Sequence, residues 1–310
     1  MADSFFGVAD TLKFNDADLD VGIIQDLLAD APLVARMFAR SVKSNTYKYL
    51  KKTANPSVGF RAENDGRENA KGTYSNVTVA LKIMDASFAM DVAVAESDER
   101  GVEAALAAQA VDHLQAAFFD VESQILYGTD ADSGGSAGLA DQTNLDGLSD
   151  AQVVNAGGTT ANTGSSCWLI RNGLSDCHLV WGQNGEISVG ERTIQRIAGA
   201  TTGTFPAYYI PITAWFGLQI GATRSVVRIA NITADSGKGL TDALIASAIS
   251  KFPAQRGPNL CVMSRRSLAQ LQQSRTATNP TGAPAPFPES SHGVPIVVTD
   301  AQLDTEALLT

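Results

Sequence analysis

SNTYKYLKKTANPSVGFRAENDGRENAKGTYSNVTVALKIMDASFAMDVAV (residues 44–94), followed by DERGVEAALAAQAVDHLQAAFFDVESQILY (residues 98–127), decides how this chain folds. The first part contains two alternating segments joined by a charged tip with glycines, and the second has the periodicity of a long amphipathic helix. Two strands alone are marginally stable in water, and the rest of the chain offers little further sheet to cover so long a hairpin. We therefore expect the hairpin to lie on another copy of the same chain.

The second strand of this hairpin changes phase along its length. Apolar residues occupy odd positions from Val77 to Ile83 and even positions from Phe88 to Val94. Because a shift of one residue exchanges the two faces of a strand, we expect a bulge or sharp twist near residues 85–87. At that point the projecting hairpin would enter the body of the fold.

The segment after the hairpin combines helical spacing with many alanines, which allow close approach to a sheet. Ser97 is a candidate N-cap, and the acids at 98–99 suit the positive end of a helix dipole. Gly128 stands where the helix should stop. We expect one helix over 98–127, about 45 Å long at a rise of about 1.5 Å per residue.

Composition describes an ordinary globular chain. Its 310 residues are 44% hydrophobic and 18% charged, which allows a sizeable core and indicates two domains. The net charge of -10 argues against a protein whose main task is binding nucleic acid, and leaves transient or shielded contact with DNA open. The acidic N-terminus is unlike a signal peptide, and no apolar run reaches the roughly 20 residues that span a bilayer. We expect folding in the cytoplasm and no membrane partner.

Charge is segregated near the N-terminus. Residues 1–22 carry five Asp and one Lys, which indicates a poorly structured acidic arm, whereas residues 31–62 contain seven Lys and Arg and no acid. A short helix is expected over 23–38, with Pro32 breaking or restarting it. Complementary blocks suit an arm that crosses onto a neighbour, and solvated faces of one monomer explain them equally well.

The second half alternates strands and helices, which makes the fold α+β. A Gly-, Ser-, Thr-, Asn- and Asp-rich stretch at 129–164 is interpreted as a surface junction. Strands are expected at 166–171, 178–182, 208–220 without a break, 226–232, 260–264 and 294–299, and helices at 240–252 and 265–274. Four prolines make 276–293 an irregular loop.

No pattern predicts catalysis, a cofactor or a metal. Cys167, Cys177 and Cys261 are an odd set without C-x-x-C spacing, which indicates reduced thiols. Cys177 and His178 are adjacent, but neighbours on a strand point to opposite faces, so a nucleophile and its base would not meet. His113 is expected to be a packed residue of the long helix, and three scattered histidines do not make a metal site. The glycines have no strand–turn–helix context for a phosphate loop.

A second basic segment lies near the C-terminus. Residues 243–288 contain no acid, and their basic residues are Lys251, Arg256, Arg265, Arg266 and Arg275. This segment suits contact with a neighbour's acidic run at 130–150, or with a polyanion. A solvated basic face is an equally good interpretation.

The order of elements and two sequence motifs resemble a known family. WFGLQI at 215–220 with RSVVRIANI at 224–232, and GVPI at 293–296, are similar to the conserved run and the closing strand of major capsid proteins of tailed bacteriophages. The shell fold of this family also occurs in encapsulins and in herpesvirus capsid floors. The resemblance covers nearly the whole chain, and its motifs are structural, so no catalytic residue is implied.

The resemblance implies a division of the chain. It predicts an N-terminal arm and short helix over 1–43, an extended hairpin loop over 44–86, a peripheral domain from 87–140 and 205–235 with a spine helix at 98–127, and an axial domain from 141–204 and 236–310.

The resemblance also implies self-assembly into hexamers and pentamers of an icosahedral virion shell around phage double-stranded DNA, without sequence-specific binding. The implied partners are a portal protein, a possible decoration protein and a separate scaffolding protein, because this chain has no room for a scaffolding segment of about a hundred residues, the size of a small domain. Assembly would take place in the host cytoplasm. Some relatives crosslink a loop Lys to an Asn, for which Lys71 alone is weak support.

We predict that the tip of the hairpin and the second basic segment contact neighbouring subunits, through Phe60, Arg61, Glu63, Asp65, Arg67, Glu68, Lys71, Arg265 and Arg266. Three alternatives stay open: an encapsulin-like compartment, a phage tail or connector component, and a thiol hydrolase acting through Cys177 or Cys167.

Overall fold

The computed structural model describes residues 30–68, 70–199, 202–279 and 283–310. The predicted acidic arm and the first part of the helix expected over 23–38 lie outside the described residues. The helices, in chain order, are α2 (Pro32–Arg36), α3 (Val92–Glu96), α4 (Val102–Tyr127), α5 (Asp242–Ile249) and α6 (Arg265–Ala277). The strands are β1 (Ala39–Ser41), β2 (Thr46–Ala54), β3 (Thr73–Ala80), β4 (Lys82–Asp85), β5 (Phe88–Asp91), β6 (Val153–Asn155), β7 (Ser165–Ile170), β8 (Cys177–Trp181), β9 (Ser188–Val189), β10 (Thr193–Ala198), β11 (Thr204–Ile210), β12 (Ile212–Ile220), β13 (Val226–Ile232), β14 (Leu260–Met263), β15 (Ser290–Ser291) and β16 (Val294–Val298).

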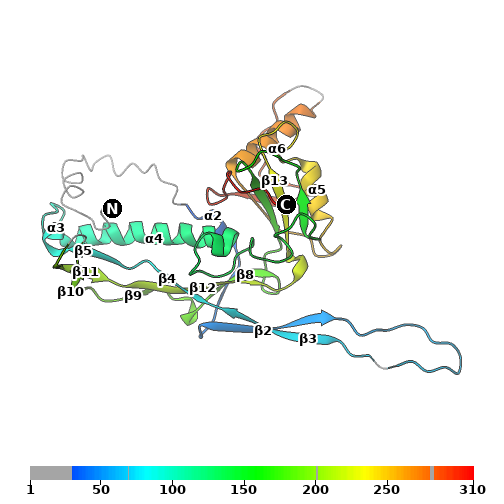
Figure 1. The fold of residues 1–310 in the computed structure, drawn as a ribbon, viewed down its shortest axis with the longest axis horizontal. Coiled ribbons are helices and arrows are strands. Elements are labelled where there is room, and N and C mark those ends of the chain that lie inside the picture. The colour runs from blue at the N-terminus through cyan, green and yellow to red at the C-terminus, as the bar shows by residue number, and fades with distance from the viewer. Residues whose placement is uncertain (1–29, 69, 200–201, 280–282) are drawn as a thin grey trace.

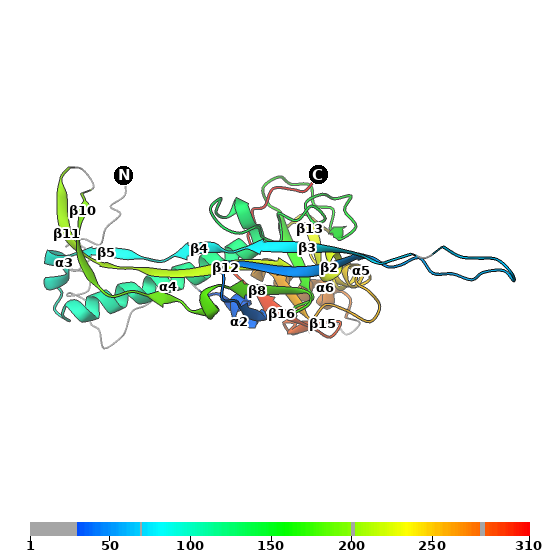
Figure 2. The same ribbon diagram turned by 90° about the horizontal axis from the view of Figure 1, so that it is seen from below.

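Three regions are visible in Figure 1. Helix α4 lies along long strands at one end, a separate sheet flanked by α5 and α6 forms the other end, and the β2–β3 hairpin projects beyond the body. The view from below in Figure 2 shows the same hairpin continuing the direction of the long strands. This arrangement agrees with the predicted order of hairpin, helix and second region.

The spine helix α4 packs on two sheets. One has the strand order β1-β8-β12-β4, with β9 also pairing with β12, and the other has the order β10-β11-β5. Ile125 near the end of α4 packs with Leu179 and Phe216, whereas Leu106 near its start packs with Phe88. The helix therefore joins both sheets into one layer.

The predicted unbroken strand at 208–220 is wrong. β11 ends at Ile210 and β12 begins at Ile212, and the two strands belong to different sheets. Pro211 stands between them, and it has no N–H to donate to a ladder. Its carbonyl accepts instead from Gly190 N at 2.8 Å. The alternation of side chains continues across the proline, which is why periodicity alone did not reveal the break.

The phase change of the second hairpin strand occurs at Leu81, about four residues before the predicted position. Leu81 is buried and belongs to neither β3 nor β4, so the alternation restarts there, with Ile83 exposed and Met84 packed toward the spine. The segment 86–87 has another role. It is the break at which the chain leaves the sheet of β12 and joins that of β11.

The start of the spine helix also differs from the prediction. Ser97 ends α3, where its hydroxyl donates to Val94 O at 2.7 Å, and α4 begins only at Val102 after Gly101. The buried Asp98 carboxylate accepts from Arg100 N and the Arg100 side chain, and Gly101 takes a φ of 90°, so these residues form a turn. The 26 residues of α4 span about 39 Å. The stop at Gly128 is confirmed.

Pro32 begins helix α2, so of the two predicted outcomes, a break or a restart of the helix, the restart is confirmed. It occupies the first turn of α2, where its missing N–H costs nothing. Leu33 N and Val34 N donate to Glu122 Oε2 of the spine at 2.9 and 3.2 Å. Burial raises the pKa of Glu122, whose other oxygen has no hydrogen-bond partner among the described residues.

None of the described helices is long and apolar enough to cross a membrane.

The separate sheet flanked by α5 and α6, called the second sheet from here on, has the strand order β15-β16-β14-β7-β13-β6. Its central strands are buried along their whole length, and the expected strands at 166–171, 226–232, 260–264 and 294–299 are confirmed within a residue or two. Short or edge strands β1, β6, β9 and β10 were not predicted. Thr241 caps α5 and Ser264 caps α6 through their side chains.

Sheet membership departs from the predicted segments in two places. β8, β9 and β10 pair around the spine, although they fall inside the predicted axial segment 141–204. β13 pairs with β7 and β6 of the second sheet, although it falls inside the predicted peripheral segment 205–235. The division into peripheral and axial domains stays a prediction.

The C-terminal tail holds the spine to the second sheet through a buried polar network. Glu306 Oε2 accepts from Arg228 Nη2 of β13 at 2.9 Å and from Ser166 Oγ of β7 at 2.6 Å, and Oε1 accepts from Tyr127 Oη of α4 at 2.7 Å. Arg228 also lies over the ring of Trp168, 4.7 Å from its centroid. Burial and Glu306 raise the pKa of Tyr127, so its hydroxyl stays a donor.

This network predicts a large effect of a single truncation. Glu306→Ala leaves the Arg228 guanidinium, only 7% exposed, without its carboxylate, and we expect the free energy of unfolding to fall by about 3–5 kcal/mol. Urea denaturation of the full chain measures this loss. Glu289→Ala removes an exposed carboxylate as the matched control and should change stability by about 0.5 kcal/mol or less. Equal effects of the two substitutions would contradict the role of the network.

Candidate inter-subunit surface

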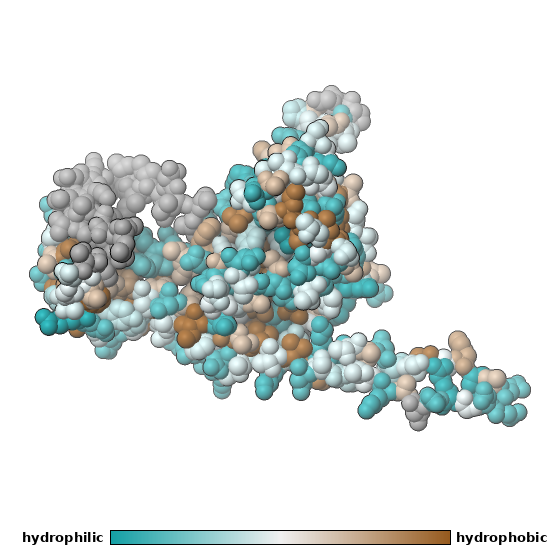
Figure 3. All heavy atoms as spheres, in the orientation of Figure 1, coloured by the Kyte–Doolittle hydropathy of each residue, from teal (hydrophilic) through white to brown (hydrophobic). Residues whose placement is uncertain are grey.

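The hairpin has no partner strand among the described residues. β2 and β3 form a two-stranded sheet of their own, paired from Thr46↔Ala80 to Ala54↔Thr73. In Figure 3 the projecting part is largely hydrophilic, with a few apolar spheres toward its tip. A sheet of two strands is marginal by itself. Among the described residues, the faces of this hairpin are therefore a β surface without a partner.

The predicted contact residues of the tip are all exposed. Phe60 is fully exposed, and the charged residues Arg61, Glu63, Asp65, Arg67, Glu68 and Lys71 are exposed as well. Two arginines bond locally: Arg61 donates to Asp65 O at 3.0 Å, and Arg67 donates to Ser57 Oγ at 3.1 Å. An apolar ring surrounded by charges of both signs is suited to docking on a polar surface. Contact with a neighbour stays a prediction.

One face of the hairpin is basic and apolar. Lys48, Leu50 and Lys52 point to the same side of β2, and Tyr74 lies opposite Lys52 on β3. Leu50 is 64% exposed and Tyr74 is 56% exposed. The predicted contact residues of the hairpin all lie in its tip, although the alternation of residues 46–54 already indicates this face.

The root of the hairpin is anchored by a buried leucine. Leu81 sits against two glycines of the body: a Cβ on Gly217 would come within 2.6 Å of Leu81 Cδ2, and a Cβ on Gly182 within 3.0 Å of Leu81 Cδ1. Leu81 N donates to Asn45 O at 3.0 Å, and Tyr49 Oη donates to Ile220 O at 3.1 Å. The absence of side chains on the two glycines creates the socket.

The two arginines of the second basic segment lie in different surroundings. Arg265 is exposed at the start of α6. Arg266 donates to Asp304 O at 3.1 Å and to Thr163 O at 2.9 Å, and its Nε lies 3.3 Å from Asp304 Oδ1. Arg266 thus holds the C-terminal tail of its own chain. A role for both arginines between subunits stays a prediction, and Arg265 is better placed for it.

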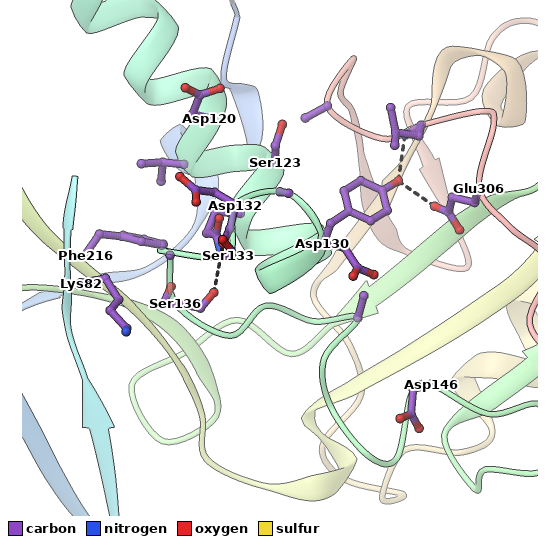
Figure 4. Close-up of a pocket in the computed structure, with 18 of the residues that line it drawn as sticks. Lys82, Asp120, Ser123, Asp130, Asp132, Ser133, Ser136, Asp146, Phe216 and Glu306 are labelled. Atoms are coloured by element: carbon purple, nitrogen blue, oxygen red, sulfur yellow. Dashed lines mark hydrogen bonds between the residues drawn. The ribbon is translucent and has the colours of Figure 1, made fainter. Parts of the chain in front are cut away.

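An acidic cavity of about 1030 Å³ opens beside the C-terminal end of the spine. Its lining includes Asp120, Asp130, Asp132 and Asp146, with Lys82 on the opposite strand. Figure 4 shows these residues around the end of α4 and the loop that follows it. Burial, and then the nearby Asp132, raise the pKa of Asp120. Asp130, Asp132 and Asp146 belong to the acidic run at 130–150 that was noted in the sequence. Asp120 also lines the cavity, but it was not recognised as a site residue because it lies within the pattern of the long helix.

The described residues do not support thiol or metal chemistry. Cys177 is buried, and burial raises its pKa to about 12. Asp176, which also raises that pKa, forms an ion pair with Arg171 rather than with the ring of His178. Cys167 lies with its sulfur 3.5 Å from that of Cys261 in the core. No group of His, Cys, Asp and Glu in the described part of the chain is arranged to hold a metal ion.

The other two histidines have structural partners. The ring of His113 stacks on Phe88 with their centroids 5.1 Å apart, which confirms the expected packed histidine. His292 Nδ1 lies 3.0 Å from Ser291 Oγ in the C-terminal loop.

Most or all of the chain is similar to a known protein family and to solved structures. A family model described as Major capsid protein GP7 matches residues 21–310. A chain of the bacteriophage Epsilon15 structure is similar over 100% of this chain and 98% of its own, with 18% identity and a TM-score of 0.72. The capsid of bacteriophage JBD30 is similar over 89% of this chain and 93% of its own, with 13% identity and a TM-score of 0.53. No curated protein matches the chain. The structural likenesses confirm the expected α+β phage major-capsid fold.

The socket at the hairpin root yields a testable prediction. Leu81→Ala empties it, and we expect the docking of the root to weaken by about 2–4 kcal/mol while the body stays folded. Hydrogen exchange of the amides in β2 and β3 should accelerate, with the exchange of β7 and β13 unchanged. Ile83→Ala, two residues away and 59% exposed, is the matched control and should leave all four strands unchanged. Exchange that accelerates equally in both variants would refute the socket.

Burial of the thiols predicts their reactivity. In the native chain at pH 8 we expect no rapid modification by a thiol-specific disulfide reagent, because Cys167, Cys177 and Cys261 are all buried. After denaturation in urea, three thiols per chain should react. Rapid modification of a single thiol in the native chain would instead support a nucleophilic cysteine.

Proposed function

Because the chain belongs to the family of the Major capsid protein GP7, we propose that it assembles into hexamers and pentamers that close into an icosahedral shell around double-stranded phage DNA. The family membership itself makes the chain a structural capsid protein of the virion and not an enzyme. The arrangement of subunits, the enclosed DNA and the assembly partners are the proposed part.

The projecting hairpin is the observation that carries this proposal. Its two strands pair only with each other, and its tip residues are exposed from Phe60 to Lys71, apart from the undescribed residue 69. We propose that the hairpin lies over the spine helix and long strands of an adjacent subunit. In a closed shell each subunit both gives and receives such a contact, so many weak contacts act together.

Charge complementarity supports the same contact. The Lys48 and Lys52 face of β2 is basic, and the cavity beside α4 carries Asp120, Asp130 and Asp132. Opposite charges favour the encounter of two copies and disfavour register errors. These charges act across the subunit boundary only in the assembled shell, where the hairpin of one copy reaches the spine of another.

The remaining proposed partners follow from the shell. A protein with a net charge of -10 would enclose DNA through local basic surface and shielding ions and not through sequence-specific binding. We propose that the partners in assembly are a separate scaffolding protein and a portal protein, with a decoration protein as an optional addition to the shell. Assembly is proposed to take place in the host cytoplasm. The acidic arm predicted for residues 1–22 would tie adjacent subunits.

Deleting residues 59–72 tests the assembly role of the hairpin. Because the deletion removes exposed tip residues and leaves the body unchanged, we expect folded subunits that form no closed shells. Circular dichroism checks the fold, and negative-stain electron microscopy checks the particles. The control is Gly66→Ala within the tip, where an added Cβ meets nothing within 4 Å and shells should form normally. Normal shells from the deletion variant would refute the proposal.

The contents and shape of native particles discriminate the alternatives. Closed shells that contain DNA support the phage capsid. Shells that contain a protein cargo and no DNA would indicate an encapsulin-like compartment, and rings or tubes would indicate a tail or connector component.

A further inference from the structure

His178 occupies an unusual position beneath the root of the hairpin. It lies on β8, is fully buried, and neither of its ring nitrogens makes a hydrogen bond of normal geometry with the described residues. The ring of Tyr47 on β2 lies against it edge-on, with the centroids 6.5 Å apart and an interplanar angle of 66°. A buried imidazole without partners is uncommon, because buried polar atoms are normally satisfied.

The surroundings of the ring favour its neutral form. On β1, the Arg40 guanidinium donates to Tyr47 Oη at 3.0 Å and lies over the Tyr47 ring, so it places a positive charge beside His178. On β12, Gln219 lies directly opposite His178 and is neutral, and its Oε1 also has no partner among the described residues. Burial and then Arg40 lower the pKa of His178, and the Gly173 carbonyl offsets this in part.

Within the described part of the chain, no carboxylate contributes to the pKa of His178. Asp176 is the acid closest in sequence, two residues away, and it is paired with Arg171. The remaining group of the hairpin face is Tyr49, which stacks on Tyr47 with the centroids 6.0 Å apart and is a neutral phenol whose pKa is raised by burial and by Tyr47. An imidazolium here would therefore be buried and close to Arg40, with the Gly173 carbonyl as its one acceptor of poor geometry among the described residues.

The hairpin is the element that can move in response. Its links to the body are short: residues 42–45 join β1 to β2, and Leu81 alone joins β3 to β4. Apart from the Leu81 socket, the named contacts that dock the root on the body are the Tyr49–Ile220 hydrogen bond, the Arg40–Tyr47 contact and the Tyr47–His178 ring contact. His178 itself lies on a central strand, β8, between β1 and β12.

We propose that His178 is a proton-operated latch at the hairpin root: the neutral ring supports the docked hairpin, and protonation of the ring favours its release. Release of the hairpin gives the imidazolium access to water, while Arg40 stays beside it because β1 is paired with β8. This inference goes beyond the proposed function because it concerns the docking of the hairpin on its own chain. In a shell, the same latch would change the angle at which the hairpin reaches its neighbour.

The direction of the pH effect follows from the lowered pKa in the docked state. The docked state is fully stabilised above the ordinary imidazole pKa of about 6.5, and this stabilisation is lost as the pH falls below that value toward the lowered pKa. Between these two values, one proton is taken up on release. The docked-to-released ratio therefore falls by up to about tenfold per pH unit.

Hydrogen exchange of the free, full-length chain between pH 7.5 and pH 5 tests the latch. After correction for intrinsic exchange, we expect protection factors of the amides in β2 and β3 near the root to fall by up to about tenfold per unit below about pH 6.5. The protection of β7 and β13 should stay constant. His178→Gln should abolish the pH dependence at the root, whereas the controls His113→Gln and His292→Gln should retain it.

A second measurement uses only the wild-type chain, so it does not require that any variant folds. NMR titration of the wild-type chain should give His178 a pKa below the ordinary imidazole value of about 6.5. A pKa of His178 at or above the ordinary value, a root whose protection does not change with pH, or a pH dependence that persists in His178→Gln would each overturn the proposal. Because these readouts use free subunits, they fail or succeed independently of whether the chain forms shells.

Discussion

A two-stranded hairpin that cannot bury its faces on its own chain is the constraint on which the structure depends. β2 and β3 pair their inward-facing backbone groups with each other, but their outer edges have no partner strand among the described residues, and Leu50, Tyr74 and Phe60 are left in water. The stability of an isolated strand pair is marginal, so the hairpin gains its full stabilisation only on a second surface. In the proposed assembly, the contact that completes the burial of the hairpin of one subunit is also the contact that links two subunits. Folding and assembly share the same interaction.

The body must then be rigid enough to present both the hairpin and its receiving surface at fixed angles. Two sets of buried polar contacts serve this purpose. Glu306 connects the last residue of the spine with β13 and β7, and Glu122, in the last two turns of the spine, connects it with the start of α2. Both carboxylates are buried within the single chain, and both accept hydrogen bonds from groups that are distant in sequence. Such networks are weak evidence for stability by themselves, but breaking them is costly, so they define one arrangement of spine, tail and sheet.

Sequence periodicity predicted the elements well and their connections poorly. The hairpin, the spine helix and the buried strands of the second sheet were predicted because their residues alternate or recur locally. The break at Pro211 was missed because side-chain alternation continues through it, and the start of α4 was misplaced because Ser97 and Gly101 both suit a helix boundary. The candidate surface was predicted in part: exposed tip charges are visible in sequence, whereas the Leu81 socket depends on glycines at 182 and 217. The Tyr127–Glu306 bond joins residues 179 positions apart, and no local pattern contains that information.

The two buried titratable groups at the boundaries of the body respond to acid in opposite ways. Protonation of His178 introduces a charge beneath the hairpin, beside Arg40 and without a compensating carboxylate. Protonation of Glu122 removes a buried charge whose pKa is already raised, and the neutral carboxyl still offers an oxygen to Leu33 N and Val34 N. A fall in pH thus weakens the attachment of the hairpin while it leaves the attachment of α2 to the spine intact. In the proposed shell, acid would therefore loosen the hairpin on its own chain while the contact between α2 and the spine is kept.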